Sequence, residues 1–404
     1  MTDLRAVEHR MRPGAAPRST GHRPTRSDAD RAAIGVLQRG FGAGAAPAVG
    51  CAPGRVTLVG EHVDYVGGRI VCMAIDLILA VAVRPSADGC WRVVSNGVRV
   101  ERPQPTMARD IGDRVFASAL ALGRCGVAIP PLEIGVAGNL PGSAGLSSSA
   151  AIVTASLVAM LRLVGGRLGA DELVAAAVTA ERDIVGVPNG ELDQRAVVHS
   201  RAHAVLVLDC ADATRRTVPW PWPEIGVIVA HSGESHDVGG EEYRLRREGA
   251  ERACIELGVT SCQEIGERWH ELPSELQPRG RHIATETRRS DAAVSALEAG
   301  DARALGRLID QSHESLRRDY RISTDRLDAM VAAARRAPGC YGARLVGAGF
   351  GGSAIALVEL GAAARCAGAM AEVAGGGHGA WLVEPADGLE ATSPDVIGPP
   401  PSKG

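Results

Sequence analysis

Aromatic residues are scarce in this sequence, at 3% of 404 residues, and long apolar runs are missing. No uninterrupted apolar stretch approaches the roughly 20 residues that a bilayer-spanning helix needs, and the N-terminus lacks the apolar centre of a signal peptide. An excess of one charge sign is also missing, since the formal net charge is -3 with both signs interspersed. Binding to nucleic acid or to an anionic membrane therefore has no electrostatic support, and we expect a cytoplasmic protein with small neutral ligands.

Closely paired cysteines are missing as well. The nine cysteines are scattered from Cys51 to Cys366 without a CxxC pair. This pattern is unlike a disulfide framework or a zinc site and predicts reduced cysteines in a core. Apolar residues, in contrast, make up 45% of the chain against 23% charged residues. A chain of this size and composition can bury a substantial core and predicts two domains.

The ends of the chain differ in composition from its middle. Residues 1–30 are rich in Arg, Pro, Ser and Gly and predict a disordered tail, and residues 393–404 predict a flexible tail. Between them we expect an N-terminal domain at 31–224 and a C-terminal domain at 225–392, of α+β class. Apolar periodicity predicts helices at 32–41, 148–164, 170–184, 241–257 and 362–373, and strands at 55–59, 70–83, 204–209, 225–230 and 380–383.

The most informative segment is a loop of small residues, LPGSAGLSSSA at 140–150, that runs directly into an apolar helix. Glycines let a backbone approach an anion closely, serines cap helices, and the first free N–H groups of a helix attract negative charge. The loop lacks the Gly-Lys-Ser/Thr ending of a Walker motif. It is either a triphosphate-binding loop or a well-capped helix start. The helix behind it is apolar nearly all round, which predicts a rigid buried platform and favours the first interpretation.

A second glycine loop, GAGFGG at 347–352, matches the dinucleotide pattern G-x-G-x-x-G. The residues that follow, 353–360, alternate and are β-branched. This loop therefore joins two strands instead of opening a helix, as a dinucleotide-binding turn would require. We interpret it either as a tight hairpin or as a loop that closes over a substrate.

Charged and titratable side chains gather at a third place, GRVTLVGEHVDY at 54–65, around a predicted strand and its exit turn. Carboxylates and an imidazole are suited to hold sugar hydroxyls, which donate and accept hydrogen bonds at once. An ordinary solvated turn explains the same residues and would be favoured on this segment alone.

Together, the three segments stand in the order and approximate spacing of the signature motifs of the GHMP kinases, the superfamily of galactokinase, homoserine, mevalonate and phosphomevalonate kinases. The first segment resembles the galactokinase signature in particular, because mevalonate and homoserine kinases lack Gly-Glu-His-x-Asp-Tyr. The resemblance covers roughly residues 31–390 and includes the segments at 73–76, 189–194, 242–247, 312–320 and 344–352. It implies a two-domain α+β GHMP-kinase fold with the active site in the cleft between the domains.

For catalysis, the resemblance implies that Asp193 accepts the proton of a sugar's anomeric hydroxyl, with Arg55 beside it. A neighbouring guanidinium favours the ionised carboxylate and makes it a weak base, so we expect Asp193 mainly to orient the hydroxyl. Arg55 would stabilise charge on the transferring phosphoryl group. This division suits phosphoryl transfer, which asks for positioning and charge neutralisation more than for proton abstraction. In isolation, Asp193 would be interpreted as a helix N-cap.

For the nucleotide, the resemblance implies ATP as co-substrate together with Mg²⁺. Glu181 and Ser149 would hold Mg²⁺, although a solvated helix face is the competing interpretation of Glu181. Such a sparse set of oxygens agrees with Mg²⁺, which prefers few protein ligands plus phosphate. The implied ATP contacts are Ser95, Ser143, Ala144, Gly145, Leu146, Ser147, Ser148 and Ser149.

For the sugar, the two carboxylates of the first segment are expected to accept hydrogen bonds from ring hydroxyls. A site built around a hydroxyl can reject an analogue lacking it by roughly 10⁴–10⁵, so departures from the family pattern matter. Galactokinases usually have Asn where this chain has Val66, and Leu-Pro where it has Val71 and Cys72. The implied sugar contacts are Glu61, His62, Val63, Asp64, Gly190 and Tyr243.

The expected activity is that of an ATP-dependent sugar 1-kinase acting on galactose or a related aldose. One alternative is a kinase for a heptose, an octose or another modified sugar, and another is a non-catalytic sensor of sugar and ATP, against which the intact Asp193 and Arg55 argue. A mevalonate- or homoserine-type kinase is a third, although Glu61 and Asp64 should repel an acidic substrate. The sequence predicts no nucleic-acid or membrane partner and leaves the oligomeric state open, with a monomer as one option.

Overall fold

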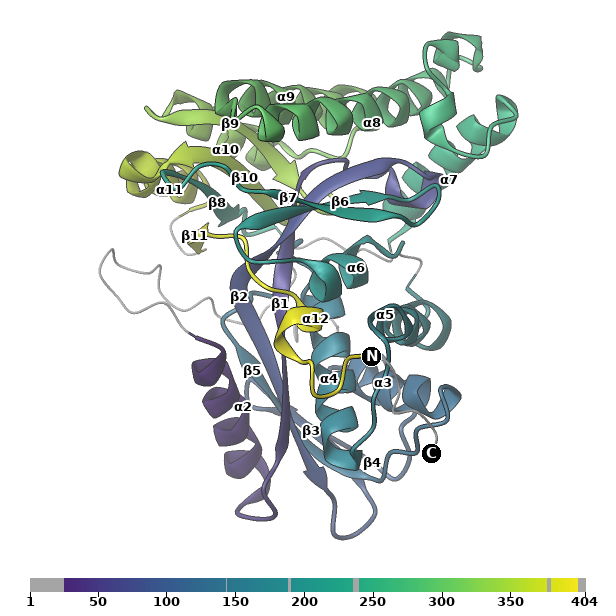
Figure 1. The fold of residues 1–404 in the computed structure, drawn as a ribbon, viewed down its shortest axis with the longest axis vertical. Coiled ribbons are helices and arrows are strands. Elements are labelled where there is room, and N and C mark those ends of the chain that lie inside the picture. The colour runs from purple at the N-terminus through teal and green to yellow at the C-terminus, as the bar shows by residue number, and fades with distance from the viewer. Residues whose placement is uncertain (1–24, 143, 188–189, 235–239, 376–378, 399–404) are drawn as a thin grey trace.

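The computed structural model describes residues 25–142, 144–187, 190–234, 240–375 and 379–398. These residues form two sheets, with helices packed around each (Figure 1). The first, seven-stranded sheet has the order β4-β3-β5-β2-β6-β7, and β1 pairs with β2 beside this path. Its strands are β1 (Ala48–Val59), β2 (Arg69–Pro85), β3 (Trp91–Ser95), β4 (Val98–Arg102), β5 (Leu132–Gly138), β6 (Ala204–Asp209) and β7 (Arg215–Pro219).

The second sheet is four-stranded and antiparallel throughout, in the order β11-β8-β10-β9. The chain passes to it from the first sheet between Pro219 and Ile225. The glycine loop at 347–352 connects β9 to β10, so the prediction that it joins two strands is confirmed. The strands are β8 (Ile225–His231), β9 (Cys340–Val346), β10 (Ser353–Glu359) and β11 (Ala380–Val383).

Helices cover both faces of the first sheet. Successive side chains of its central strand, β2, pack on opposite faces and are buried on both. In β2, Ile78, Ala80 and Ala82 pack against α2, and the intervening Leu79 and Val81 pack in the core that includes α3 and α4. This is the period-2 pattern of a strand buried on both sides. The helices of this half are α2 (Arg26–Phe41), α3 (Asp113–Arg124), α4 (Ser148–Val164), α5 (Ala170–Val178) and α6 (Leu192–His199) (Figure 1).

Helix α4 lies very close to β1. A Cβ atom on Gly50 would stand 2.1 Å from the carbonyl oxygen of Ala155, so glycine is required at this crossing. The helix is buried along most of its length, as its apolar sequence predicts. It therefore holds the loop at its N-terminus on a rigid support.

The second sheet is also covered by helices. Successive side chains of its strand β10 again pack on opposite faces. Ile355 and Leu357 belong to the core that includes Leu305 and Ile309 of α9, whereas Ala356 packs on the opposite side. The helices of this half are α7 (Glu241–Glu256), α8 (Gln277–Glu298), α9 (Ala302–Ser315), α10 (Asp325–Arg336) and α11 (Ala363–Val373). The last helix, α12 (Leu389–Thr392), lies against α6 of the first half. No helix within the described ranges combines the length and apolar character needed to cross a membrane.

The N-terminal boundary differs from the prediction. Helix α2 begins at Arg26 instead of residue 32, so residues 26–30 are helical and not part of a disordered tail. Thr25 and Asp28 form a capping box, and Arg26 donates hydrogen bonds to the carbonyl oxygens of Cys51 (3.2 Å) and Asp387 (2.7 Å). These caps and tertiary contacts compensate the polar composition. Residues 1–24 lie outside the described residues.

The C-terminal boundary also differs. After Val383 the chain leaves the second sheet and returns to the first half, where α12 lies (Figure 1). Leu389, Val396 and Ile397 are buried in its core, and the N–H of Leu168 donates to the carbonyl oxygen of Val396. The predicted flexible tail is therefore wrong for residues 393–398, because their few apolar side chains find a place in a core that lies far away in the sequence. Residues 399–404 lie outside the described residues.

The cysteines follow the prediction only in part. Cys51, Cys72, Cys254, Cys262 and Cys366 are buried, whereas Cys125 is exposed.

Candidate active site

Arg55 and Asp193 lie in direct contact. Arg55 is in β1 and Asp193 is in the first turn of α6, where Glu191 occupies the N-cap position. The Arg55 Nε donates to Asp193 Oδ1 at 2.8 Å, and Nη2 lies 2.6 Å from the same oxygen. Burial alone would lower the pKa of Arg55, but the Asp193 and Glu61 carboxylates outweigh it and raise that pKa. Arg55 is therefore a permanent cation at this place.

Arg55 also holds the glycine and serine loop before α4. Its Nη1 donates to the carbonyl oxygen of Gly145 at 2.8 Å, and its backbone N–H donates to the carbonyl oxygen of Leu146 at 3.1 Å. One arginine thus joins the candidate catalytic carboxylate to the candidate phosphate loop.

The two glycine loops pack backbone to backbone. Gly145 has φ 71°, and a Cβ atom on it would stand 2.9 Å from the carbonyl oxygen of Val346. Across the contact, Gly347 would place its own Cβ 3.0 Å from the Cα of Gly145. Sequence reasoning identified both loops separately, and the structure brings them together.

The start of α4 corrects one expectation. Ser147 occupies the N-cap position with φ 61°, and its side chain makes no capping hydrogen bond. Its Oγ is buried and, within the described part of the chain, has no hydrogen-bond partner. A buried hydroxyl without a partner beside the free N–H groups of a helix suits an anionic ligand. Ser143, also expected here, lies outside the described residues.

Glu181 is buried, so the interpretation as a solvated helix face is wrong. It lies in a π-helical segment, Thr179–Val185, in which its neighbours Arg182 and Asp183 are exposed and pair with each other at 3.1 Å. Burial raises the pKa of Glu181, while the Arg114 guanidinium and hydrogen bonds from Gln194 and Ser149 oppose this rise. The expected pair of Glu181 and Ser149 therefore lies close enough for the Ser149 hydroxyl to act on the Glu181 carboxylate.

This pair fits a sparsely coordinated magnesium ion. Among the described residues, no three His, Cys, Asp or Glu side chains gather as a metal-binding group. One buried carboxylate and one hydroxyl cannot enclose an ion, but they suit Mg²⁺ that is held largely by phosphate oxygens.

Asp64 and Gly190 approach each other closely. Asp64 begins a 3₁₀ turn, Asp64–Val66, and a Cβ atom on Gly190 would stand 1.9 Å from its Oδ2, so a side chain at 190 would displace the carboxylate. Burial, together with the negative charges of Asp193 and Glu61, raises the pKa of Asp64 to about 6. The carboxylates of Asp64, Asp193 and Glu61 therefore lie close enough to act on one another.

His62 is held as a neutral ring. Its Nδ1 lies 2.8 Å from the Tyr65 hydroxyl and its Nε2 lies 3.2 Å from the carbonyl oxygen of Ala348. Burial lowers the pKa of His62 to about 3, so it is not a general base near neutral pH. The buried Tyr243 of α7 packs against it, with ring centroids 5.6 Å apart.

Val63 and Ser95 are less directly placed. The Val63 side chain is fully buried in the core of the second half, which leaves only its backbone for a ligand. Ser95 ends β3 opposite Val136 of β5, the strand that leads toward the glycine and serine loop. A nucleotide contact at Ser95 stays a prediction.

Arg344 is the residue that sequence reasoning missed most clearly. It lies in β9, is fully buried, and donates to the Glu61 carboxylate and to the carbonyl oxygen of Leu58 (3.3 Å). Its Nη1 also lies 3.8 Å from Glu286 Oε1. The signal was an arginine within an apolar strand, because a buried charge requires a partner.

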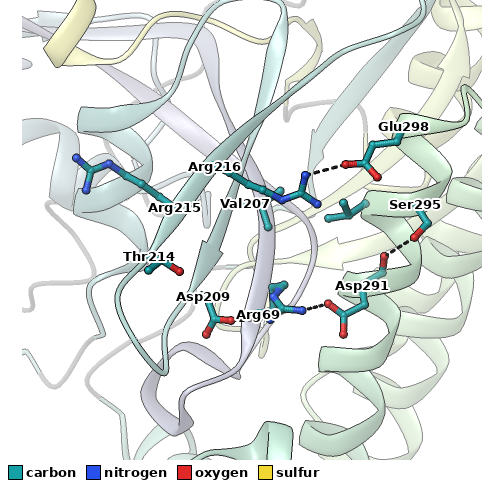
Figure 2. A pocket seen from close by; sticks show the side chains of 10 residues that line it. Arg69, Val207, Asp209, Thr214, Arg215, Arg216, Asp291, Ser295 and Glu298 are labelled. Atoms are coloured by element: carbon teal, nitrogen blue, oxygen red, sulfur yellow. Dashed lines mark hydrogen bonds and ion pairs between the residues drawn. The ribbon is translucent and has the colours of Figure 1, made fainter.

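A cavity of about 490 Å³ lies elsewhere, between the β6–β7 hairpin and α8 (Figure 2). Its charged side chains are paired: Arg69 contacts Asp209 at 2.6 Å and also Asp291, and Arg216 contacts Glu298 at 2.7 Å. Because these charges neutralise one another and none belongs to the group around Arg55, we do not assign the cavity to the candidate site.

Three family profiles match the chain. The profile described as GHMP kinases N terminal domain matches residues 113–201, and the one described as GHMP kinases C terminal matches residues 293–375. A galactokinase galactose-binding signature matches residues 38–85, which include Arg55, Glu61 and Asp64.

Curated relatives and solved structures agree with these profiles. A galactokinase of Roseiflexus sp. is 38% identical over 325 residues, covering 76% of this chain and 82% of the relative. Human galactokinase is 33% identical over 358 residues, covering 84% and 91%. The crystal structure of Lactococcus lactis galactokinase complexed with galactose matches with a TM-score of 0.81 and 25% identity, covering 87% of this chain and 97% of that one.

A Methanococcus jannaschii mevalonate kinase shares the fold at a lower TM-score of 0.63 and 18% identity, covering 85% of this chain and 99% of that one. The fold and the site thus define a kinase of the GHMP class, a phosphotransferase with an alcohol group as acceptor. Within that class, the chain belongs to the galactokinase family.

Proposed function

We propose that the chain is an ATP-dependent sugar 1-kinase that converts galactose or a closely related aldose and ATP into sugar 1-phosphate and ADP. The observation that carries this proposal is the position of Arg55, which contacts Asp193 on one side and the Gly145 carbonyl on the other. A sugar hydroxyl at Asp193 and a γ-phosphate at the loop would both lie beside the same guanidinium. Residues of both halves contact one another around Glu61, which supports an active site between the domains.

In the proposed reaction, Asp193 accepts a hydrogen bond from the anomeric hydroxyl and orients its oxygen toward the γ-phosphorus. The sugar O–P bond forms as the bond from the γ-phosphorus to the ADP oxygen breaks, and the hydroxyl proton passes to Asp193. The transition state is loose, so positioning and charge neutralisation dominate. Arg55 supplies the positive charge for the transferring group and holds the Asp193 carboxylate in position.

The nucleotide would lie along the glycine and serine loop at the N-terminus of α4. The Ser147 hydroxyl, which has no hydrogen-bond partner among the described residues, and the first N–H groups of the helix can donate to phosphate oxygens. Ser149 and Glu181 would hold Mg²⁺, which when bound neutralises phosphate charge. Ala144, Leu146 and Ser148 complete the proposed loop, and Ser95 is proposed as a further nucleotide contact.

The sugar would be recognised by Glu61, Asp64, Gly190, His62 and Tyr243, with the Glu61 carboxylate held by Arg344. Galactose is favoured by the matched galactose-binding signature. A heptose, an octose or another modified sugar is the second candidate. Val66, where galactokinases usually have Asn, is the departure that favours it.

We test this with an ATP- and Mg²⁺-dependent ADP-release assay over aldoses, deoxy sugars, heptoses and octoses, with mevalonate and homoserine included. Turnover of an aldose with the phosphate on C1, located by phosphorus-coupled NMR, is the expected result. Binding of sugar and ATP without turnover would establish a sensor instead. Turnover of the hydroxy acids alone would contradict the sugar-kinase proposal.

The remaining proposals concern the cell. We infer a cytoplasmic location, small-molecule partners only, and no nucleic-acid or membrane partner, all from composition and charge. A sedimentation measurement decides whether the protein is a monomer.

A further inference from the structure

Helix α8 of the second half contacts the turn that carries Glu61 through two side chains one helical turn apart. His282 Nε2 lies 3.1 Å from the carbonyl oxygen of Glu61, and Glu286 Oε1 accepts from the N–H groups of Gly60 (2.9 Å) and Glu61 (3.4 Å). Residues four apart share one face of a helix. Both polar ends of the Glu61 backbone are therefore bound by one face of α8.

The same two side chains are themselves fixed by buried partners. Ser312 donates to Glu286 Oε1 at 2.6 Å, Arg289 donates to Glu286 Oε2 at 2.8 Å, and Ser315 lies 2.9 Å from His282 Nδ1. Burial lowers the pKa of His282 to about 4, so the neutral ring donates from Nε2 to Glu61 and accepts from Ser315 at Nδ1. Both side chains are buried and are held by hydrogen bonds at each of their polar atoms.

Glu286 also shares a cation with Glu61. Arg344 donates to the Glu61 carboxylate and lies 3.8 Å from Glu286 Oε1. Burial alone would raise the pKa of Glu286, but the guanidinium groups of Arg289 and Arg344 outweigh it and lower that pKa to about 2. Glu286 thus remains charged and limits how strongly Arg344 binds Glu61.

We propose that His282 and Glu286 are positioning residues that set the geometry and the hydrogen-bonding capacity of Glu61 toward the sugar. They act through Glu61 and Arg344 and do not touch the reacting atoms. This inference rests on the proposed sugar-kinase function and adds that sugar recognition depends on α8, an element outside the signature motif.

The experiment is a double-mutant cycle of Glu286→Gln and Glu61→Gln, read as KM and kcat for galactose and, separately, KM for ATP. We expect E286Q to lower kcat/KM for galactose roughly 10- to 100-fold, as for a displaced binding group, and to leave KM for ATP within about 2-fold. In the E61Q background the same change should cost less than about 3-fold, because its route of action is gone.

The matched control is Glu298→Gln on the same helix. Glu298 makes a half-exposed ion pair with Arg216 at the cavity of Figure 2, so its loss should leave both KM values within about 2-fold. Additive losses in the cycle, or equal rises in the KM for galactose and for ATP, would show a merely structural role and overturn the proposal. Where E286Q does not fold, Ser312→Ala removes one hydrogen bond to Glu286 and is held to the same pattern.

The wild type, measured in parallel, separates the two proposals. If it phosphorylates galactose and E286Q matches it, only the role of α8 is overturned. If it binds but does not phosphorylate sugar, affinity by calorimetry replaces KM in the cycle. If it neither binds nor phosphorylates any aldose, both proposals are overturned.

Discussion

The Arg55 guanidinium holds two groups at once, the Asp193 carboxylate and the Gly145 carbonyl. A buried guanidinium is stable only when acceptors are fixed around it. Arg55 in turn holds these acceptors in place. At the residue scale the site is therefore a network of mutually dependent charges. Arg344 and Arg55 act on Glu61, Arg55 pairs with Asp193, and Arg247 is the cation that acts on Asp64.

Asp193→Asn tests the proposed catalytic carboxylate. The amide cannot take a proton and leaves Arg55 without its counter-charge, so we expect kcat to fall about 10²- to 10⁴-fold. ADP release at saturating substrates measures it, with a melting curve to show that the variant folds. Asp183→Asn, an exposed carboxylate that pairs with Arg182, is the control and should keep full activity. Near-normal turnover of D193N would remove Asp193 from its proposed role.

Asp64 predicts a pH dependence of sugar use. Its pKa is about 6 in the protein, and only the ionised carboxylate accepts from two hydroxyls. The kcat/KM for the sugar should therefore fall as the pH decreases through about 6, with a slope of one proton. The limb should be absent in Asp64→Asn, whose overall kcat/KM is lower. An unchanged limb in D64N would assign the titration to another group.

The same pKa predicts a stability effect of known sign. Because the folded pKa of Asp64 lies above its unfolded value of 3.8, its contribution is fully present below pH 3.8 and is lost as the pH rises through about 6. D64N lacks this loss. Its free energy of unfolding relative to wild type should therefore increase by up to roughly 3 kcal/mol between pH 4 and pH 7. Urea denaturation at the two pH values checks it, and a constant difference would contradict the shift.

At the scale of elements, the contact between the two glycine loops decides how nucleotide and sugar sites meet. The first loop precedes α4 and the second joins β9 to β10, and they touch at Gly145 and Gly347. The second loop also supplies the Ala348 carbonyl to His62. Movement of one loop would therefore be transmitted to both sites.

Gly145→Ala tests this contact. A Cβ atom would stand 2.9 Å from the Val346 carbonyl oxygen and would force the loops apart, so we expect KM for ATP to rise at least about 10-fold. Gly165→Ala at the other end of α4 is the matched control, because Gly165 has a similar φ of 67° with nothing within 4 Å of its Cβ. It carries the left-handed strain of roughly 1 kcal/mol without the clash. Equal kinetic effects of both variants would show that strain alone is responsible.

Helices and strands with many apolar residues, or with regular alternation of apolar and polar residues, could be predicted from the sequence. Helices and strands without such a pattern could not. The bounds of α4 and β6 agree with the prediction because each is a long or continuous apolar segment. Strand β7 has four exposed residues of five, and β4 alternates weakly, so neither produces a signal. Such strands form because a neighbouring strand supplies partners for their backbone hydrogen bonds. These partners cannot be recognised from the composition of the segment.

At the scale of the whole molecule, the C-terminal segment ties the end of the chain to its first half. Leu389, Val396 and Ile397 enter the core that also contains α4 and β2. The two halves are thus linked twice, at 219–225 and again after β11. Removing the segment should weaken the half that carries Arg55 and the phosphate loop.

Leu389→Ala measures this tie. Leu389 is fully buried, so its truncation should lower the free energy of unfolding by about 2–5 kcal/mol, the usual range for a core leucine. Leu360→Ala, the same change at a side chain that is 38% exposed, is the control and should cost much less. Denaturant unfolding compares them. Equal costs would mean that the segment does not stabilise the first half.

The sequence by itself determined the order of the motifs and the family that they resemble, because these depend on residue types at short spacing. The class of fold and the expected roles of Arg55, Glu61, Asp64, Asp193 and the loop residues followed from that resemblance. Only the tertiary structure decided which of these meet, since Arg344, Glu286 and His282 reach Glu61 from positions more than 200 residues away. Burial decided the rest, because desolvation turns Asp64 into a titrating group and keeps His62 neutral. Desolvation depends on what surrounds a side chain, and the residues that surround these side chains are not their neighbours in the sequence.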